Sequence, residues 1–168
     1  MLPTNPKTIT SPASSDCGGV TTASGGAGNN NAGSIEIIAD GALNVAAGHE
    51  LHVDGGQLGG NAGQLEVSGK HNINLQGEMT GIALAGYQGG SLLIDPSNIL
   101  VNSAATPGLA GGPTFSALAG AGTLSINAAA FKTFANTNFA GGTVKLNALN
   151  DITIAADIGT AAARLNEN

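Results

Sequence analysis

The fold is decided by a short motif of alternating apolar and polar residues that occurs three times. Its first copy is Ala32-Gly33-Ser34-Ile35-Glu36-Ile37, and its second copy is Ala62-Gly63-Gln64-Leu65-Glu66-Val67. The third copy is Gly89-Gly90-Ser91-Leu92-Leu93-Ile94. The copies begin at residues 32, 62 and 89, so they are 30 and 27 residues apart. A repeat of this length is typical of proteins that stack one structural unit on the next.

Two further alternating segments lie between successive copies of the motif. Leu43-Asn44-Val45 matches Ile73-Asn74-Leu75, and Leu51-His52-Val53 matches Ile82-Ala83-Leu84. Because side chains alternate between the two faces of a strand, the apolar residues of each segment share one face. The sequence therefore predicts an all-β fold, a parallel β-helix (solenoid) with about three strands per coil and apolar faces pointing inward.

The stacking register also predicts which polar side chains are neighbours. Asn44 falls next to Asn74, where we expect a ladder of hydrogen-bonded side-chain amides. Glu36 falls next to Glu66, a like-charge contact that solvent would screen. An up-and-down antiparallel barrel would also give alternating strands, but it would not give three-strand repeats in matching register.

Composition divides the chain into three parts. Residues 1–31 are rich in Gly, Ser and Asn and are predicted to be a disordered leader. Residues 32–160 are predicted to form the β-helix segment, and residues 161–168 a tail. We treat the chain as one domain, because no other composition change is abrupt enough to mark a second.

The β pattern is interrupted once in its later part. Asn127 is positioned to cap a short helical insertion near 127–139, with Phe131 and Phe134 on one face. We expect this helix to pack against the outside of the coil. The Pro- and Gly-rich stretch 107–113 before it is predicted to be a loop.

Charge and cysteine content exclude several function classes. Only 10% of the residues are charged, the net charge is −6 and no basic cluster exists, so nucleic acid is not an expected partner. The single cysteine, Cys17, excludes an internal disulfide framework and a thiolate metal cluster. No apolar run is long enough to span a bilayer, so membrane insertion is not expected, and the first residues have no signal-peptide pattern.

Three stretches carry a resemblance to a known family. Gly89-Gly90-Ser91-Leu92-Leu93-Ile94-Asp95-Pro96-Ser97-Asn98-Ile99-Leu100-Val101-Asn102 resembles a signature segment of filamentous haemagglutinin-like large exoproteins, the passengers of two-partner secretion. Residues 124–131 and 142–154 look like the next coil of the same family. The resemblance implies a right-handed parallel β-helix within a long stalk that is secreted or exposed at the cell surface. It also implies export through an outer-membrane transporter and adhesion to a host or neighbouring cell through a receptor or glycan.

The tetrapeptide Asp95-Pro96-Ser97-Asn98 within that signature is predicted to turn a corner. Pro96 cannot donate to a strand ladder, Asp95 and Ser97 can bond local backbone groups, and Asn98 tolerates a left-handed conformation. We therefore interpret the tetrapeptide as a structural motif that bends the coil. It supplies no chemical site.

Histidines and carboxylates are the candidates for chemistry. His49, His52 and His71 could suggest a metal or haem site, but their spacing does not require them to converge, so we interpret them as surface residues. Glu36 and Glu66 could instead serve a β-helical carbohydrate-active enzyme, a polysaccharide lyase or hydrolase, which is the alternative function.

A solvated strand face explains the two glutamates more simply. The lone Tyr87 could stack on a sugar, although covering a coil edge is the simpler role. The sequence predicts no catalytic residue, cofactor or metal. We expect a structural and adhesive segment and not an enzyme.

Overall fold

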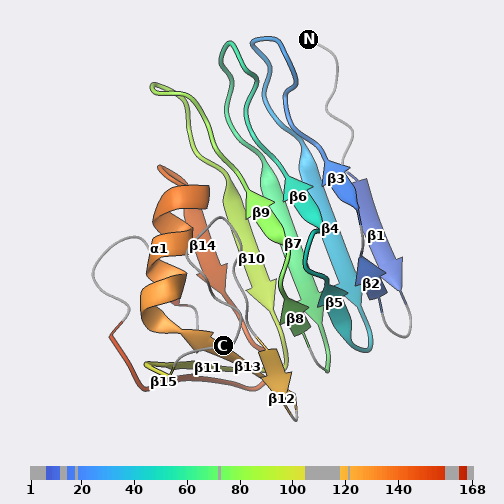
Figure 1. The fold of residues 1–168 in the computed structure, drawn as a ribbon, viewed down its shortest axis with the longest axis vertical. Coiled ribbons are helices and arrows are strands. Elements are labelled where there is room, and N and C mark those ends of the chain that lie inside the picture. The colour runs from blue at the N-terminus through green and yellow to red at the C-terminus, as the bar shows by residue number, and fades with distance from the viewer. Residues whose placement is uncertain are drawn as a thin grey trace.

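The chain is built mainly of short parallel strands, with one helix among the described residues (Figure 1). The computed structural model describes residues 7–11, 15–17, 19–71, 73–104, 118–120, 122–157 and 163–165. Within these ranges no helix is long and apolar enough to cross a membrane. The predicted loop at 107–113 lies outside the described residues.

Three successive segments of the chain each supply three strands. The first supplies β1 (Lys7–Ser11), β2 (Ser15–Cys17) and β3 (Val20–Thr22). The second supplies β4 (Ser34–Ala39), β5 (Leu43–Val45) and β6 (Glu50–His52). The third supplies β7 (Gln64–Gly69), β8 (Ile73–Leu75) and β9 (Glu78–Thr80). Equivalent strands pair in parallel, in the orders β1-β4-β7, β2-β5-β8 and β3-β6-β9.

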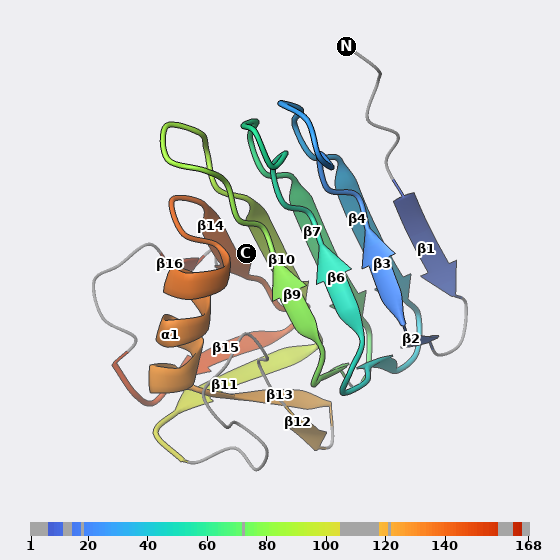
Figure 2. The same cartoon turned by 45° about the horizontal axis from the view of Figure 1, so that its top comes forward.

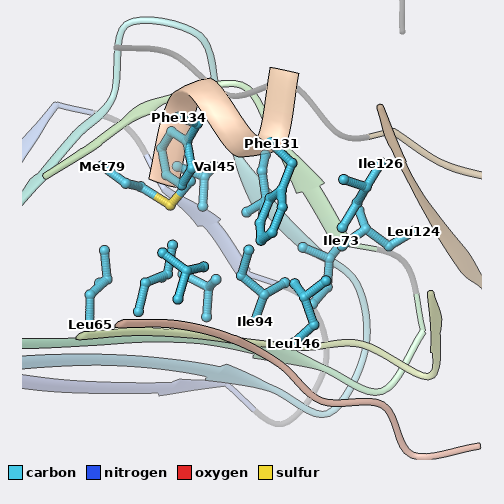
Figure 3. Close-up of a cluster of buried hydrophobic side chains, with 14 of the residues drawn as sticks. Val45, Leu65, Ile73, Met79, Ile94, Leu124, Ile126, Phe131, Phe134 and Leu146 are labelled. Carbon is cyan, nitrogen blue, oxygen red and sulfur yellow. The ribbon is translucent and has the colours of Figure 1, made fainter. Parts of the chain in front are cut away.

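The observed pairing agrees with the predicted register at the first two strand positions. Ile35 pairs with Leu65, and Leu65 pairs with Leu92 of the third motif copy. Leu43 pairs with Ile73 in the second position. These side chains are buried and belong to one core that the three sets of strands enclose, and Figure 3 shows Leu65 and Ile73 within it.

The predicted register is wrong at the third strand position. Leu51 pairs with Met79 and not with Ile82, and the side chains of Ile82 and Leu84 are 45% and 49% exposed. The reason is a change of turn length. Four residues separate β5 from β6, whereas only two separate β8 from β9, so β9 begins earlier than a fixed repeat predicts. Met79 then fills the core position expected of Ile82.

Both ends of the chain contain strands that the sequence analysis did not predict. Residues 7–11, 15–17 and 20–22 of the supposed leader are strands that pair with β4, β5 and β6. At the other end, β16 (Ala163–Leu165) pairs with β14. A composition rich in Gly and Asn suggested disorder, but these residues form turns between strands that an existing sheet edge holds by backbone hydrogen bonds.

The later chain continues the main sheet by a less regular path. It contains β10 (Ser91–Asp95), β11 (Asn98–Asn102), β12 (Leu118–Gly120), β13 (Thr123–Asn127), α1 (Ala128–Asn138), β14 (Thr143–Leu146) and β15 (Asp151–Ile154). The six-stranded parallel sheet has the order β1-β4-β7-β10-β14-β16. A separate sheet of order β12-β13-β11-β15 runs across the end of its strands (Figure 2). The pair β12–β13 is antiparallel, and the other pairs are parallel.

The helix forms where the sequence predicts it, but it does not pack on the outside. Asn127 caps α1 by accepting a hydrogen bond from the Ala130 backbone N–H at 2.9 Å. Phe131 and Phe134 are buried in the main core, on the side facing Ile94 and Leu146 (Figure 3). The helix therefore contributes two aromatic side chains to the main core.

The end of α1 continues the row of third strands. The backbone N–H of Gly81, directly after β9, donates to the carbonyl of Asn138 at 2.8 Å. The Asn138 side chain, which is buried, donates to the Met79 carbonyl at 3.0 Å. The last turn of α1 therefore takes the position that another third strand would occupy beside β9.

A column of four glycines lies where four neighbouring strands of the main sheet begin, namely β4, β7, β10 and β14. The glycines are Gly33, Gly63, Gly90 and Gly142. Each carbonyl of the first three accepts a hydrogen bond from the strand residue that follows the next glycine, at 2.9 to 3.1 Å. A Cβ on Gly63 would lie 1.8 Å from the Gly33 carbonyl oxygen, so no larger residue fits there. The column continues from the regular segments into the irregular part of the chain.

Candidate functional site

The tetrapeptide Asp95–Asn98 forms the corner between β10 and β11. Asp95 ends β10 and Asn98 begins β11, so the left-handed conformation that Asn98 would tolerate is not used and its backbone is part of a strand. Its side chain donates to the carbonyl of Gly122 at 3.2 Å. The predicted corner is thus present between the two strands.

The side chains of this corner bond distant parts of the chain and not local backbone. The Ser97 hydroxyl donates to the carbonyl of Lys70 in the preceding segment. Asp95 accepts a hydrogen bond from the Asn147 side chain in the following segment, at 3.1 Å. The side chains of the corner therefore hydrogen-bond both the preceding and the following segment. This supports a structural role for the tetrapeptide.

Asn44 and Asn74 are partners in the pairing of β5 with β8. A hydrogen-bonded ladder between their amides stays a prediction. Ladders of another kind occur at the edge of the fold, where a side-chain oxygen accepts from the backbone of the next segment. Asn31 accepts from Asn61 N–H at 2.9 Å, and Asn61 accepts from Gln88 N–H at 3.0 Å.

A second ladder runs beside the first. Ser24 accepts from the Asp54 backbone N–H at 3.0 Å, and Asp54 accepts from the Ile82 backbone N–H at 2.7 Å. Sequence reasoning missed both ladders. A comparison of Asn31-Ala32-Gly33 with Asn61-Ala62-Gly63 would have shown that the repeat extends one residue further back, to the asparagines.

The two candidate carboxylates lie on the outer face of the main sheet. Glu36 and Glu66 are register partners, and Glu66 also accepts a hydrogen bond from the Ser68 hydroxyl at 2.7 Å. They line a shallow groove of about 210 Å³. Lys145 lies in the same row, because Glu66 pairs with Leu93 and Leu93 pairs with Lys145. The fold thus places Lys145 in the same groove as the two glutamates, although it is distant from both in sequence.

The three histidines do not converge. His49 is 2% exposed, so its interpretation as a surface residue is wrong; it lies in the turn between β5 and β6. His71 is exposed, and His52 lies part-buried on β6. Among the described residues no group of three His, Cys, Asp or Glu side chains could hold a metal ion.

His52 is the centre of a polar network on the sheet β3-β6-β9. Its Nδ1 lies 2.6 Å from the Thr80 hydroxyl, and its Nε2 lies 3.1 Å from the Glu50 carboxylate. The Thr80 hydroxyl also donates to Asp54 at 2.9 Å. These residue types could make a nucleophile with a base, but Thr80 is buried, at 4% exposure, and its hydroxyl is already bonded within the network. The network joins β6 to β9.

Three loops lie side by side at one edge of the fold (Figure 1). We call residues 25–33, 55–63 and 82–90 the loop edge. Tyr87 crosses it, since its hydroxyl lies 3.4 Å from the Asn29 side-chain oxygen two loops away. Gly59 lies beneath the ring, where a Cβ would come within 2.5 Å of the tyrosine oxygen. Tyr87 therefore contacts both of the other loops, which agrees with the covering role expected from the sequence. The residue remains 41% exposed.

No protein-family model, curated protein or solved structure matches the chain.

Proposed function

We propose that the chain is a segment of a right-handed parallel β-helix that belongs to a large bacterial exoprotein, secreted or exposed at the cell surface. Its role is structural and adhesive: it forms part of a stalk and presents loops to another cell. Export would use an outer-membrane transporter partner, and the receptor would be a protein or glycan of a host or neighbouring cell. The chain is not proposed to act as an enzyme.

The observation that carries the proposal is the parallel pairing of three sets of strands in sequence order. Each of the first three segments adds one strand to each of three sheets before the chain returns to the first. Such a path is the path of a helical coil. Parallel strands of one sheet that are joined by a crossover almost always make it right-handed, which supports the handedness implied by the family resemblance.

The distribution of polar groups supports a structural role. The side chains of the Asp95–Asn98 corner and of the two ladders bond other parts of the chain, so they stabilise the stack. The only described Thr-His-carboxylate network has its hydroxyl buried. What remains for recognition is the exposed surface, in particular the loop edge.

A carbohydrate-active enzyme is the second candidate, and the position of Lys145 favours it. Glu66 lies on β7 and Lys145 lies on β14, with β10 between these two strands. Two strand spacings correspond to roughly 10 Å between the backbones of the two residues. A carboxylate and an ammonium group in one groove could act on a polysaccharide. Cleavage of polysaccharides by the chain, lost in Glu66→Gln and kept in Asp151→Asn, an exposed carboxylate outside the groove, would favour this candidate.

Adhesion is tested with beads that carry the folded chain. We expect such beads to be retained on cultured epithelial cells or on bacterial cells more strongly than beads that carry the heat-unfolded chain. Equal retention of the two kinds of bead would contradict the proposal. Soluble chain added as a competitor should reduce retention in proportion to its concentration, which separates specific contact from trapping.

A further inference from the structure

We propose that the loop edge is a binding site for an uncharged saccharide, with the exposed face of Tyr87 as its platform. This deepens the proposed function, because it names the ligand class of the adhesive surface. The site is built from three loops that are distant in sequence and side by side in space (Figure 1).

The first argument is a rigid aromatic platform. Tyr87 is anchored by its backbone N–H to the Leu84 carbonyl at 3.0 Å and by its hydroxyl to Asn29. The hydroxyl end of the ring lies against Gly59, and 41% of Tyr87 is exposed to solvent. Leu58, next to Gly59, is 73% exposed. An aromatic ring whose orientation is already fixed can stack on the apolar face of a sugar ring with little loss of side-chain entropy.

The second argument is a set of amide groups on the same loop edge, which reaches Tyr87 through the hydrogen bond from the backbone N–H of its neighbour Gln88 to Asn61. Asn31 and Asn61 use their side-chain oxygens in the ladder, which fixes the orientation of both amides. The described residues offer no hydrogen-bond acceptor to the NH₂ groups of these amides. The two asparagines line an open groove of about 380 Å³, together with Ser34 and Gln64. Oriented NH₂ groups, a hydroxyl and a glutamine amide match the alternating donors and acceptors of sugar hydroxyls.

The third argument is charge. Residues 25–33, 55–63 and 82–90 contain no Asp, Glu, Lys, Arg or His, although the chain as a whole has a net charge of −6. A sulfated or sialylated glycan would need basic residues to offset its own charge. Without them, the loop edge fits a neutral saccharide.

A saccharide is favoured over a protein partner by the make-up of this surface. Its large exposed apolar residues are Leu58, Ile82, Leu84 and Tyr87, of which only Tyr87 is aromatic, and glycines and amides lie among them. Protein interfaces usually gather several large side chains around a desolvated centre. The loop edge provides one ring with polar groups around it, which is the usual arrangement for small polar ligands.

The test measures binding of the 168-residue chain to immobilised oligosaccharides. The neutral probes end in galactose, glucose, mannose or N-acetylglucosamine, and the charged probes are a sialylated and a sulfated oligosaccharide. We expect binding to at least one neutral probe and weaker binding to the charged ones. A preference for the charged probes, or binding to none of the neutral ones, overturns the proposal. Binding only to cell-surface proteins from which the glycans have been removed also overturns it.

Variants locate the site. Tyr87→Ala should weaken binding about tenfold, the effect of losing roughly 1.4 kcal/mol of ring contact. Tyr87→Phe keeps the ring and should bind within about twofold of the unchanged chain. Gln64→Ala should weaken binding several-fold. Leu149→Ala should have no effect, because Leu149 is exposed beside Pro96, at the other end of β10 from the loop edge.

Circular dichroism of each variant separates binding from folding. The result that contradicts the site is full binding by a folded Tyr87→Ala variant. If that variant unfolds, loss of binding in folded Gln64→Ala supports the site, and its full binding contradicts it.

The two proposals fail separately. Beads that adhere to cells through a chain that binds no neutral sugar would refute this inference alone. A chain that binds neutral sugars, on beads that do not adhere, would refute the adhesive role alone.

Discussion

The part of the chain before Asp95 and the part after it extend the same sheet by different means. Before Asp95, each segment repeats three strands of similar length, and the core is made of Ile, Leu, Val and Met side chains. After it, a hairpin and a helix replace strands, and the core gains Phe131, Phe134 and Phe139. The comparison teaches that the main sheet does not depend on a fixed path between its strands.

The phenylalanines follow from the replacement of a strand by a helix. A helix with its side chains is about 10 Å across, whereas neighbouring strands are about 4.8 Å apart, so its axis lies further from the facing sheet. Larger side chains are needed to fill that space. Phe134 and Phe139 pack with their ring centres 5.7 Å apart, which closes the core beside β9. The regular segments need no such filling.

The largest expected effect comes from the glycine column that both parts share. Gly63→Ala places a Cβ 1.8 Å from a backbone carbonyl that cannot rotate away. The cost should exceed the range of about 1–3 kcal/mol that is typical of overpacking, and we expect no cooperative thermal transition. Gly48→Ala is the matched control, since its Cβ would meet open space and only its φ of +84° is unfavourable, at about 1–2 kcal/mol. Similar melting curves for the two variants would show that the column is not essential.

Removal of a helix anchor tests whether the two parts unfold together. Phe131→Ala should lower the free energy of unfolding by about 3–5 kcal/mol, because the ring is 1% exposed and leaves a cavity. Hydrogen exchange distinguishes the outcomes. If β4 and β7 exchange faster along with α1, the parts are one cooperative unit. If only the residues after Asp95 exchange faster, the regular segments are stable on their own.

A smaller effect is expected at the start of α1. Asn127→Ala removes the oxygen that accepts from the Ala130 N–H and should cost about 1 kcal/mol, measured by urea denaturation. Asn127→Asp keeps the acceptor and should remain within about 0.5 kcal/mol of the unchanged chain. An equal loss in both variants would mean that the contact of the Asn127 amide with the Ala104 carbonyl matters more than the cap.

The smallest effect is expected at the corner between the two parts. Ser97→Ala removes the hydrogen bond to the Lys70 carbonyl and should cost about 0.5–1.5 kcal/mol. Ser97→Thr keeps the hydroxyl and serves as the control. A stability of Ser97→Ala equal to that of the unchanged chain would show that this hydrogen bond contributes little to the attachment of the two parts.

Sequence reasoning predicted the features that depend on local pattern. Alternation identified β4, β5, β7, β8 and β10, and an asparagine before an alanine-rich stretch identified the start of α1. It failed where the answer depends on three-dimensional context. A turn shortened by two residues moved β9, and the burial of Phe131 depends on a sheet that approaches from elsewhere in the chain.

The candidate site was only partly predictable for the same reason. Tyr87 was visible as the lone tyrosine, but its contact with Asn29 joins residues 58 positions apart. Nor did the sequence reveal that Asn31 and Asn61 are aligned by accepting from the backbone of the next segment. The strands near the start of the chain were missed because glycine and asparagine in tight turns have the same composition as a disordered segment.

The glycine column has a consequence for how such a chain can lengthen or shorten during evolution. Gly33 and Gly63 occupy equivalent positions, and each is followed by a polar residue that begins a strand. Removal of residues 34–63 would join Gly33 to Gln64, so the new junction would again be a glycine followed by a polar strand residue. Duplication of the same 30 residues would insert one more unit in register. Unequal recombination between glycine codons could therefore change the number of units while each product keeps an intact sheet.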